Sequence, residues 1–499
     1  MTQVHYDLFV VGGGINGTGI AADASGRGLK VGLCEMGDLA HATSSSSSKL
    51  IHGGLRYLEH YEFRLVREAL NEREVLLKVA PHLVTPMRFQ MPHRPHLRPA
   101  WLIRIGLFLY DNLGKREALA GSRGVKYNAD SPLKADITQG FEYSDCWVDD
   151  ARLVVINALS AQQNGASIFA RTRCNAAKRD HGLWRIELED QLTHQITEVT
   201  ATALVNAAGP WVSSFIETKM ERKAPYGIRM IKGSHIVVPR LYKESNAFIM
   251  QNVDKRIVFA IPYREHYTLI GTTDVEYKGD PDKVAITAEE TSYILSVAND
   301  HFKKQLTPDD IVWSYSGVRP LLEDESDNPS AVTRDYTLHL EDEESKAPLL
   351  SIFGGKITTY RQLALLAMRK LTPYFDNMGA PWTHSKPLPG GDLGMPLDAF
   401  GIQLQRQYPF ISAHNAQRFA NSYGTLTHLM LDKISNEAEL GHCFGNELYQ
   451  VEVDYLIKHE WAHSAEDILW RRTKLGLEMS QNEVKALQEY IEKSLAIAA

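Results

Sequence analysis

The sequence predicts an α/β protein that also contains an antiparallel sheet and an all-helical C-terminal region. Three observations predict this class. An apolar run, Leu8–Val11, leads directly into a G-x-G-x-x-G loop and a helical segment, which is typical of a parallel sheet. Apolar and polar residues alternate in several runs between residues 228 and 272, which indicates antiparallel strands. From about residue 396 to 499 the chain lacks strand-like runs and has helical periodicity.

The glycine loop has the spacing of a dinucleotide-binding motif. Gly12 permits a tight turn after the strand, Gly14 lets the backbone approach a pyrophosphate, and Gly17 lets the next helix pack closely. We expect that helix to span Ile15–Arg27. Its free N–H groups and the positive end of its dipole would then face the phosphates.

An acidic residue follows the second predicted strand. Gly28 ends the helix, Lys30–Cys34 forms the strand, and Glu35 lies 18 residues after Gly17. A carboxylate at about this spacing accepts hydrogen bonds from a ribose diol, and it repels a 2′-phosphate, which argues against NADP. The motif alone does not separate NAD from FAD.

Length and composition narrow the remaining classes. A chain of 499 residues exceeds what one hydrophobic core supports, so we expect two or three domains. The net charge of −7 does not favour nucleic-acid binding. Four widely spaced cysteines predict a cytoplasmic protein without a disulfide framework and without a metal site. The polar start and the lack of a long apolar stretch predict neither a signal peptide nor a transmembrane helix.

The order of the predicted strands makes the domains discontinuous. Ala203–Gly209 and Leu349–Gly355 are apolar runs that end in small residues, like strands that deliver a loop to a ligand. Between them, Ile228–Pro239, Arg256–Ile261 and Tyr267–Thr272 alternate as antiparallel strands do. The predicted boundaries are 1–80, 145–225 and 335–385 for the nucleotide domain, 81–144 and 226–334 for a substrate domain, and 390–499 for a helical domain.

A serine-rich block, Thr43-Ser-Ser-Ser-Ser-Ser-Lys-Leu-Ile-His-Gly-Gly-Leu-Arg-Tyr57, is the most specific segment of the chain. A simple serine-rich loop before an amphipathic helix would leave Gly53 and Gly54 unexplained. A loop of hydroxyls and N–H groups around a flavin dinucleotide, ending with Arg56 and Tyr57 at the ring, explains the whole block.

This block and six further motifs resemble the FAD-dependent glycerol-3-phosphate dehydrogenases, and most of all the aerobic, respiratory enzymes of bacteria. The six motifs are Gly12–Gly17, Asn206–Trp211, Lys232–His235, Gly271–Asp274, Ser316–Pro320 and Gly354–Tyr360. The similarity extends from about residue 5 to residue 490. It implies the glutathione-reductase-like FAD fold of the D-amino-acid-oxidase superfamily.

The resemblance implies that FAD is the cofactor and is held non-covalently. The residues expected to contact it are Gly12, Gly14, Asn16, Gly17, Glu35, Thr43, Ser44, Ser48, Lys49, Leu50, Gly209, Trp211, Gly354, Gly355, Ile357 and Thr358. The two glycines at 354 and 355 precede Lys356 and a helical run, Ile357–Lys370. A helix N-terminus and a lysine would stabilise the negative charge that reduced flavin carries around N1 and O2.

The implied reaction oxidises sn-glycerol 3-phosphate at C2 to dihydroxyacetone phosphate by hydride transfer to FAD, and the electrons pass to a membrane quinone. A glycerol-3-phosphate oxidase that uses oxygen, or another FAD-dependent oxidase of the superfamily, is the alternative. Whichever acceptor is used, a phosphomonoester needs several cations, and the alcohol needs a base that removes its hydroxyl proton.

Candidate substrate residues stand inside or beside the motifs. The resemblance implies a substrate pocket lined by Arg56, Tyr57, Thr272, Arg319, Arg334 and Lys356. His235 begins an apolar strand and is the preferred base, because a neutral imidazole accepts a proton near pH 7. Arg319 or Lys356 would instead stabilise a developing alkoxide. The sequence leaves this division open, so all three are candidate catalytic residues.

The segment Arg94–Arg116 bears on membrane attachment. Its centre, Pro99–Tyr110, is short and apolar, and arginines and lysines flank it. This composition suits a helix that lies in the plane of the membrane interface, and a buried helix of the substrate domain is the alternative. The resemblance implies peripheral attachment to the inner face of the cytoplasmic membrane. The sequence leaves the oligomeric state open, and a homodimer is one candidate.

Two other functional classes remain at this stage. An NAD-dependent dehydrogenase would share the glycine loop but would leave the serine-rich block and Gly354–Thr359 unexplained. A non-catalytic interaction protein that works through its C-terminal helices would need neither a flavin nor a cationic pocket. Flavin absorbance of the purified protein separates these classes from a flavoenzyme.

Overall fold

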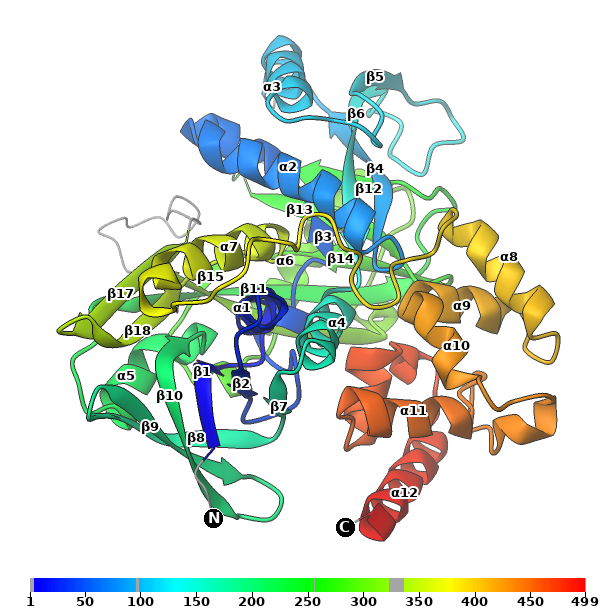
Figure 1. Ribbon diagram of the computed structural model, residues 1–499. Helices are drawn as coiled ribbons and strands as arrows, with labels where there is room; N and C mark the ends of the chain where they lie inside the picture. The colour runs from blue at the N-terminus through cyan, green and yellow to red at the C-terminus, as the bar shows by residue number, and fades with distance from the viewer. Residues whose placement is uncertain (1–3, 96–97, 253, 255, 323–335, 499) are drawn as a thin grey trace.

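The computed structural model describes residues 4–95, 98–252, 254, 256–322 and 336–498. Two sheets and a helical C-terminal region make up this part of the chain (Figure 1). Figure 1 shows the first sheet at the lower left, the helical region at the lower right, and a layer with helix α3 at the top.

The first sheet is built around parallel strands in the order β18–β10–β1–β2–β7. Their bounds are Val4–Val11 for β1, Val31–Cys34 for β2, Ser167–Phe169 for β7, Ile196–Asn206 for β10 and Lys346–Phe353 for β18. Strand β17 (Thr337–Glu343) pairs antiparallel with β18, and the hairpin of β8 (Thr172–Asp180) and β9 (Leu183–Asp190) joins β10. The predicted parallel sheet is therefore present, and its strand order reverses at β1, where such sheets bind ligands.

The last four residues of strand β1, Leu8–Val11, are apolar because both faces of the strand are covered there. Leu8 and Val10 belong to one core with α1 (Ile15–Gly26), α4 (Asp150–Gln163) and α7 (Tyr360–Leu371). Phe9 belongs to a second core on the opposite face, where α5 (Val212–Lys219) packs. The first helix ends one residue before the predicted end, and Arg27 caps it.

The second sheet is mostly antiparallel, as predicted, in the order β15–β11–β14–β13–β12–β4–β6–β3. Its strands are β3 (Leu50–Ile51), β4 (Val84–His93), β5 (Arg123–Lys126), β6 (Gln139–Val148), β11 (Ile228–Pro239), β12 (Ala247–Gln251), β13 (Ile257–Tyr263), β14 (Tyr267–Gly271), β15 (Val275–Tyr277) and β16 (Trp313–Leu322). Strand β5 pairs with β6, and β16 pairs with β11. Helices α2 (Phe63–Val79), α3 (Ala100–Asn112) and α6 (Ala288–His301) pack around this sheet.

The strands of the two sheets alternate along the chain. Residues 50–51, 84–148 and 228–322 supply the second sheet, whereas residues 4–34, 167–206 and 337–353 supply the first. Strand β6 continues through the predicted boundary between residues 144 and 145. The division into domains stays a prediction.

The C-terminal region is helical, as the sequence predicts, and has a hydrophobic core of its own. Its elements are α8 (Leu397–Gln407), α9 (Ala413–Tyr423), α10 (Thr427–Met430), α11 (Gln450–Glu460), a π-helix (Asp467–Arg472) and α12 (Gln481–Ala498). Over the described ranges, no helix is both long enough and apolar enough to cross a bilayer.

Candidate active site

A cavity of about 530 Å³ opens at the carboxyl ends of the parallel strands and extends to the second sheet. Its lining comes from the glycine loop, the serine-rich block, the loop after β10, strand β16 and the loop after β18. This volume is within the range of cofactor and ligand sites. The cavity therefore joins the motifs that lie far apart in the sequence.

The glycine loop at one end of this cavity leaves no room for side chains. Gly12 has a φ of +113°, and a Cβ there would lie 2.4 Å from the carbonyl oxygen of Ala207. A Cβ at Gly17 would lie 1.9 Å from the carbonyl oxygen of Gly12. Gly14 stands at the N-terminus of α1, beside the cavity. This close backbone approach, with a helix N-terminus at its end, fits the pyrophosphate of a dinucleotide.

Glu35 lies at the end of β2, is buried and lines the cavity. Its carboxylate accepts hydrogen bonds from the N–H groups of Gly13 (2.6 Å) and Gly37 (2.9 Å). The Nδ1 atom of His41 is 3.4 Å from the same carboxylate. Two backbone donors therefore hold Glu35 at the cavity edge, where a ribose would reach it, and the ribose contact itself stays a prediction.

The serine-rich block folds over the cavity through its own hydroxyls. Thr43 donates to the carbonyl of Val318 (2.8 Å), and Ser44 accepts from the N–H of Ile15 (3.0 Å). Ser47 donates to Asp150 (2.8 Å) at the start of α4. These contacts tie one loop to β16, α1 and α4 together.

The predicted cofactor residues separate into two groups. Those that line the cavity are Gly12, Gly14, Asn16, Glu35, Thr43, Ser44, Ser48, Leu50, Gly209, Trp211, Gly354, Gly355, Ile357 and Thr358. Gly17 lies behind the lining, where its packing against the Gly12 turn needs a glycine. The side chain of Lys49 is buried and forms an ion pair with Asp150 (2.8 Å), so it is directed away from the cavity. The contact of Lys49 with the cofactor stays a prediction.

The loop after β18 matches its predicted form. Gly354 and Gly355 have φ values of +79° and +103°, and a short 3-10 turn, Ile357–Thr359, leads into α7. Asn16 donates to the carbonyl of Gly354 (3.2 Å), which joins this loop to α1. The N-terminal side of the predicted helix therefore faces the cavity, with Lys356 before it.

Four predicted substrate residues line the cavity and form two contacting pairs, Tyr57 with Lys356 and Thr272 with Arg319. Arg319 donates to Asp274 (2.5 Å) and to the hydroxyl of Thr272 (3.3 Å). The Lys356 ammonium lies 3.9 Å from the centre of the Tyr57 ring. Arg56 is half-buried beside Tyr57 but outside the lining, and Arg334 lies outside the described residues.

His235 is one layer behind the cavity. Its ring is 2 % exposed and stacks on Tyr315, with centroids 4.8 Å apart. Its Nε2 atom is 2.9 Å from the hydroxyl of Ser48, which does line the cavity. Burial, and then the charges of Arg319 and Lys49, hold the pKa of His235 well below its usual value, so the ring is neutral at pH 7. His235 is therefore linked to the cavity through Ser48, and its role as the base stays a prediction.

Sequence reasoning missed two histidines of the lining, His41 and His52. His52 directly precedes Gly53 and Gly54 in the serine-rich block, and its N–H donates to Thr358 (3.3 Å). Its position beside two glycines is the signal that would have identified it. His41 shows no comparable sequence signal, because its neighbours Glu35 and Trp211 meet only in the fold.

The loop that carries His52 and Tyr57 is anchored from behind. The N–H of Gly53 donates to the hydroxyl of Tyr110 (2.8 Å), which in turn donates to Asp145 (2.7 Å). A Cβ at Gly53 would lie 2.7 Å from that hydroxyl. Burial raises the pKa of Tyr110 well above its usual value, so it keeps its proton. The requirement for glycine at 53 therefore comes from this anchor together with Leu70, whose Cδ2 atom would lie 2.5 Å from the same Cβ.

Two family models match this chain. Residues 7–361 match the family described as FAD dependent oxidoreductase. Residues 381–494 match the family described as C-terminal domain of alpha-glycerophosphate oxidase. Together these matches span both sheets and the helical region.

Curated relatives are similar over nearly the whole chain. A glycerol-3-phosphate dehydrogenase of Pseudomonas aeruginosa is 60% identical over 98% of this chain and 95% of its own length. An aerobic glycerol-3-phosphate dehydrogenase of Escherichia coli is 57% identical over 99% of both chains. A D-erythritol 1-phosphate dehydrogenase of Brucella abortus is 48% identical over 99% of both chains.

Among solved structures, the glycerol-3-phosphate dehydrogenase of Bacillus halodurans in complex with FAD matches with a TM-score of 0.75 and 27% identity. The match covers 99% of this chain and 95% of that one. The cavity described above, with its glycine loop and Glu35, has the features that a bound FAD needs.

Proposed function

Because the chain belongs to the family of FAD-dependent glycerol-3-phosphate dehydrogenases, we propose that it oxidises sn-glycerol 3-phosphate at C2 to dihydroxyacetone phosphate. FAD, when bound, supplies the acceptor of the hydride. The observation that carries the proposal is the pair of cations, Arg319 and Lys356, that lines a cavity of dinucleotide character. The names of the Pseudomonas aeruginosa and Escherichia coli relatives support this substrate.

The substrate end of the cavity suits a phosphomonoester. Arg319 is oriented by Asp274, and its second guanidinium nitrogen lies beside the Thr272 hydroxyl. Lys356 approaches from the opposite loop, above the ring of Tyr57. A planar guanidinium can donate two parallel hydrogen bonds to the oxygens of one phosphate, and a lysine adds a positive point charge. Arg56 and Arg334 stay predicted contributors to this pocket.

Proton removal from the substrate hydroxyl is assigned to the pair Ser48 and His235. With its proton on Nδ1, the neutral ring of His235 would accept a hydrogen bond at Nε2 from Ser48, whose hydroxyl faces the cavity. The proton of the substrate would pass to Ser48 Oγ as the Ser48 proton passes to the imidazole. Arg319 and Lys356 would stabilise the negative charge that develops on the substrate oxygen.

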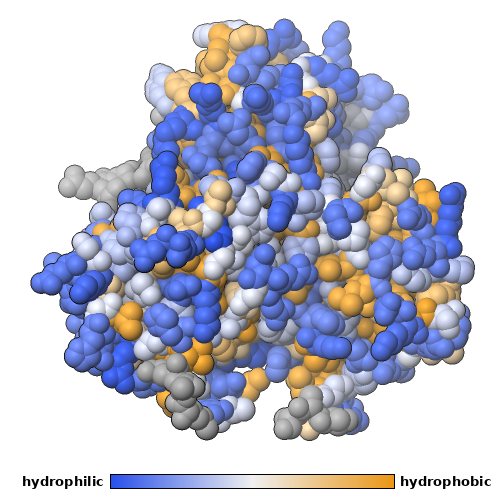
Figure 2. Space-filling model, viewed as in Figure 1, coloured by the Kyte–Doolittle hydropathy of each residue, from blue (hydrophilic) through white to orange (hydrophobic). Residues whose placement is uncertain are grey.

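The electron acceptor is proposed to be a quinone reached at the inner face of the cytoplasmic membrane. Helix α3 supports this proposal, because Trp101 and Phe108 are 64% and 65% exposed, and Leu102 and Ile105 are also exposed. Figure 2 shows this apolar surface over α3 at the top of the molecule. Its opposite side, with Ile103 and Leu107, is buried. Such a helix can bury one apolar face at headgroup depth.

The cations around α3 contribute less to membrane attraction than their number suggests. Arg94 forms an ion pair with Asp136 (3.1 Å), Arg98 with Glu59 (2.5 Å), and Arg116 with Asp111 (2.9 Å). Paired cations attract anionic lipid more weakly than unpaired ones, because the net charge of the pair is small. We therefore infer that apolar burial, more than charge, drives the membrane contact. Reaction with oxygen stays the alternative fate of the electrons.

Anaerobic reduction of the bound flavin tests the substrate directly. The purified protein, loaded with FAD, is mixed with sn-glycerol 3-phosphate, glycerol or D-erythritol 1-phosphate, and the loss of flavin absorbance is followed. We expect rapid loss with sn-glycerol 3-phosphate and very slow loss with glycerol, because glycerol leaves the cations without a phosphate. Faster reduction by the four-carbon phosphate would assign the chain to the activity named for the Brucella relative. Equal rates with glycerol and its phosphate would refute phosphate recognition.

A further inference from the structure

A short basic segment of the C-terminal region, residues 471–474, reaches the loops that border the cavity. It begins at the end of the π-helix and contains Arg471, Arg472 and Lys474. All three side chains are buried, which is unusual for these residue types unless they are paired. We call these residues the basic segment.

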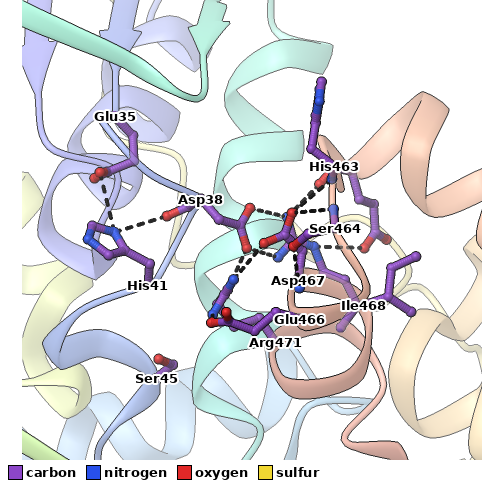
Figure 3. A network of polar contacts seen from close by, with 12 residues as sticks. Glu35, Asp38, His41, Ser45, His463, Ser464, Glu466, Asp467, Ile468 and Arg471 are labelled. Carbon is purple, nitrogen blue, oxygen red and sulfur yellow. Dashed lines mark hydrogen bonds and ion pairs between the residues drawn. The ribbon is translucent and has the colours of Figure 1, made fainter. Parts of the chain in front are cut away.

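Asp38 is the first partner of the basic segment. Its carboxylate is 2 % exposed, lies 2.5 Å from Nε of Arg471, and is held at 2.7 Å by two nitrogens of Arg472. Arg471 also contacts Asp467 (2.5 Å). Arg171 and Arg471 lower the pKa of Asp467 to about 2 although burial opposes them, so this network stays charged. Figure 3 shows Asp38 between Arg471 on one side and His41 on the other.

Asp38 belongs to the loop that follows Glu35 and borders the cavity. Its carbonyl oxygen lies 3.2 Å from Nδ1 of His41, and the same nitrogen is 3.4 Å from the Glu35 carboxylate (Figure 3). The N–H of Ala40 donates to the carbonyl of Gly13 (3.2 Å). The loop held by Asp38 therefore contacts both the predicted ribose carboxylate and the glycine loop.

A second arm of the basic segment reaches the other border of the cavity. Lys474 forms an ion pair with Asp149 (2.7 Å), and this ammonium lowers the pKa of Asp149 although burial opposes it. The next residue, Asp150, accepts from Lys49 (2.8 Å) and Ser47 (2.8 Å) of the serine-rich block. Contacts from the basic segment thus lead to both loops that enclose the nucleotide half of the cavity.

We propose that the basic segment makes the C-terminal region a positioning element for FAD, with Asp38 as the positioning residue that holds the Glu35–His41 loop in its binding conformation. A buried ion-pair network adds little net stability compared with apolar packing, but it fixes geometry. Without Asp38, the loop must be ordered when FAD binds, and that ordering weakens the observed affinity. The proposal rests on FAD binding in this cavity.

The test compares Asp38→Asn with Glu452→Gln in the full-length protein. Glu452 is a matched control, because it is fully buried, accepts from two nitrogens of Arg418 (2.6 Å each), and has its contacts within the C-terminal region, apart from the basic segment. Both variants neutralise a buried carboxylate that faces arginine, so both should lower the melting temperature of the FAD-free protein. We expect Asp38→Asn to raise the dissociation constant for FAD at least tenfold, and Glu452→Gln to change it less than twofold.

Titration of the FAD-free proteins, followed by flavin fluorescence, measures these constants without any turnover. Equal affinity in wild type and Asp38→Asn, or an equal loss in both variants, would overturn the proposal. A wild-type protein that does not bind FAD would instead refute the cofactor assignment itself. If Asp38→Asn does not fold, Arg471→Gln replaces it, because Arg472 still pairs with Asp38. Arg471→Gln should weaken FAD binding about threefold, and unchanged affinity would contradict the proposal.

Discussion

Residues that border the cavity are each held by a partner behind them. Two backbone N–H groups hold Glu35, His235 holds Ser48, and Asp274 holds Arg319. Reacting groups that are fixed in this way need little reorganisation when substrate binds.

The local glycine motif and Glu35 could be predicted from spacing, because a strand, a turn and a helix determine their positions. The placement of Lys49 and His235 could not, because Asp150 and Tyr315 are distant in sequence.

Replacement of Arg319 by alanine is expected to lower kcat/KM for sn-glycerol 3-phosphate, since a charged phosphate loses its main partner. The corresponding loss of transition-state stabilisation is about 2–4 kcal/mol. The reaction with glycerol should change far less, and dye-coupled assays of both substrates measure the difference. Asp274→Asn is the control, because it keeps the cation and removes only the carboxylate that orients it. An equal loss with both substrates would contradict a phosphate-binding role.

His235→Ala and Ser48→Ala are each expected to slow flavin reduction in single-turnover mixing, and the double variant should be no slower than the slower single variant. Residues that act as one proton-transfer unit are non-additive. Because the pKa of His235 is well below its usual value, the wild-type rate should show no loss of the base between pH 6 and 8. Additive effects, or unchanged reduction in both single variants, would transfer the role to another group, with His52 the first candidate.

Secondary-structure elements were predictable where their pattern was regular. The predicted range Ile228–Pro239 is the observed β11, and β13 and β14 begin within a residue of the expected positions. Strand β4 was missed, because Pro86 and Arg88 interrupt its alternation, and Arg88 is held by Glu142 of β6 (2.8 Å). Pairing with a distant strand, which no local pattern reveals, makes this segment a strand.

Variants of helix α3 can separate the two interpretations of its composition, which are a helix at the membrane interface and a buried helix of the substrate domain. Changing Trp101, Leu102, Ile105 and Phe108 together to polar residues should leave the melting temperature nearly unchanged, because these side chains are exposed. If the helix binds the membrane surface, the variant should keep activity with a soluble dye but lose liposome binding and quinone reduction together.

Ile103→Ala with Leu107→Ala is the matched control on the buried side of α3. It should lower the melting temperature, since deleting buried apolar atoms is destabilising, and should leave liposome binding of the folded protein unchanged. Full liposome binding by the exposed-face variant would show that another surface carries the attachment.

The whole molecule depends on contacts between residues that are far apart in the chain. Asp38 meets Arg472, and Trp470 stacks on Trp313 of β16, with ring centroids 4.4 Å apart. The helical character of residues 396–499 was predictable from their periodicity. The attachment of this region to both sheets was not, because ion pairs between distant segments leave no periodic signal in a sequence.

His82 makes the stability of the molecule dependent on pH. Burial and the charge of Arg152 lower its pKa to about 3, whereas an unfolded histidine titrates near 6.5. Below about pH 6.5 the unfolded chain binds a proton that the folded protein does not, so stability falls as the pH falls toward 3. At pH 5 this group alone lowers the free energy of unfolding by about 2 kcal/mol.

His82→Gln should therefore reduce the drop in melting temperature between pH 7.5 and pH 5. His384→Gln, which changes an exposed histidine, should leave that drop as it is in wild type. Thermal scans of the three proteins at a fixed scan rate measure it, because a chain of several domains is not expected to unfold in two states. The same pH dependence in all three proteins would contradict the assignment to His82.

The measurement that tests the central claim most directly is the anaerobic reduction of bound FAD by sn-glycerol 3-phosphate that carries deuterium at C2. If hydride leaves C2 within the cavity, a single turnover should bleach the flavin several-fold more slowly with the deuterated substrate than with the ordinary one, and dihydroxyacetone phosphate should form in equal amount to reduced flavin. Identical rates would contradict rate-limiting transfer from C2, and a flavin that stays oxidised with either substrate would contradict the proposed function.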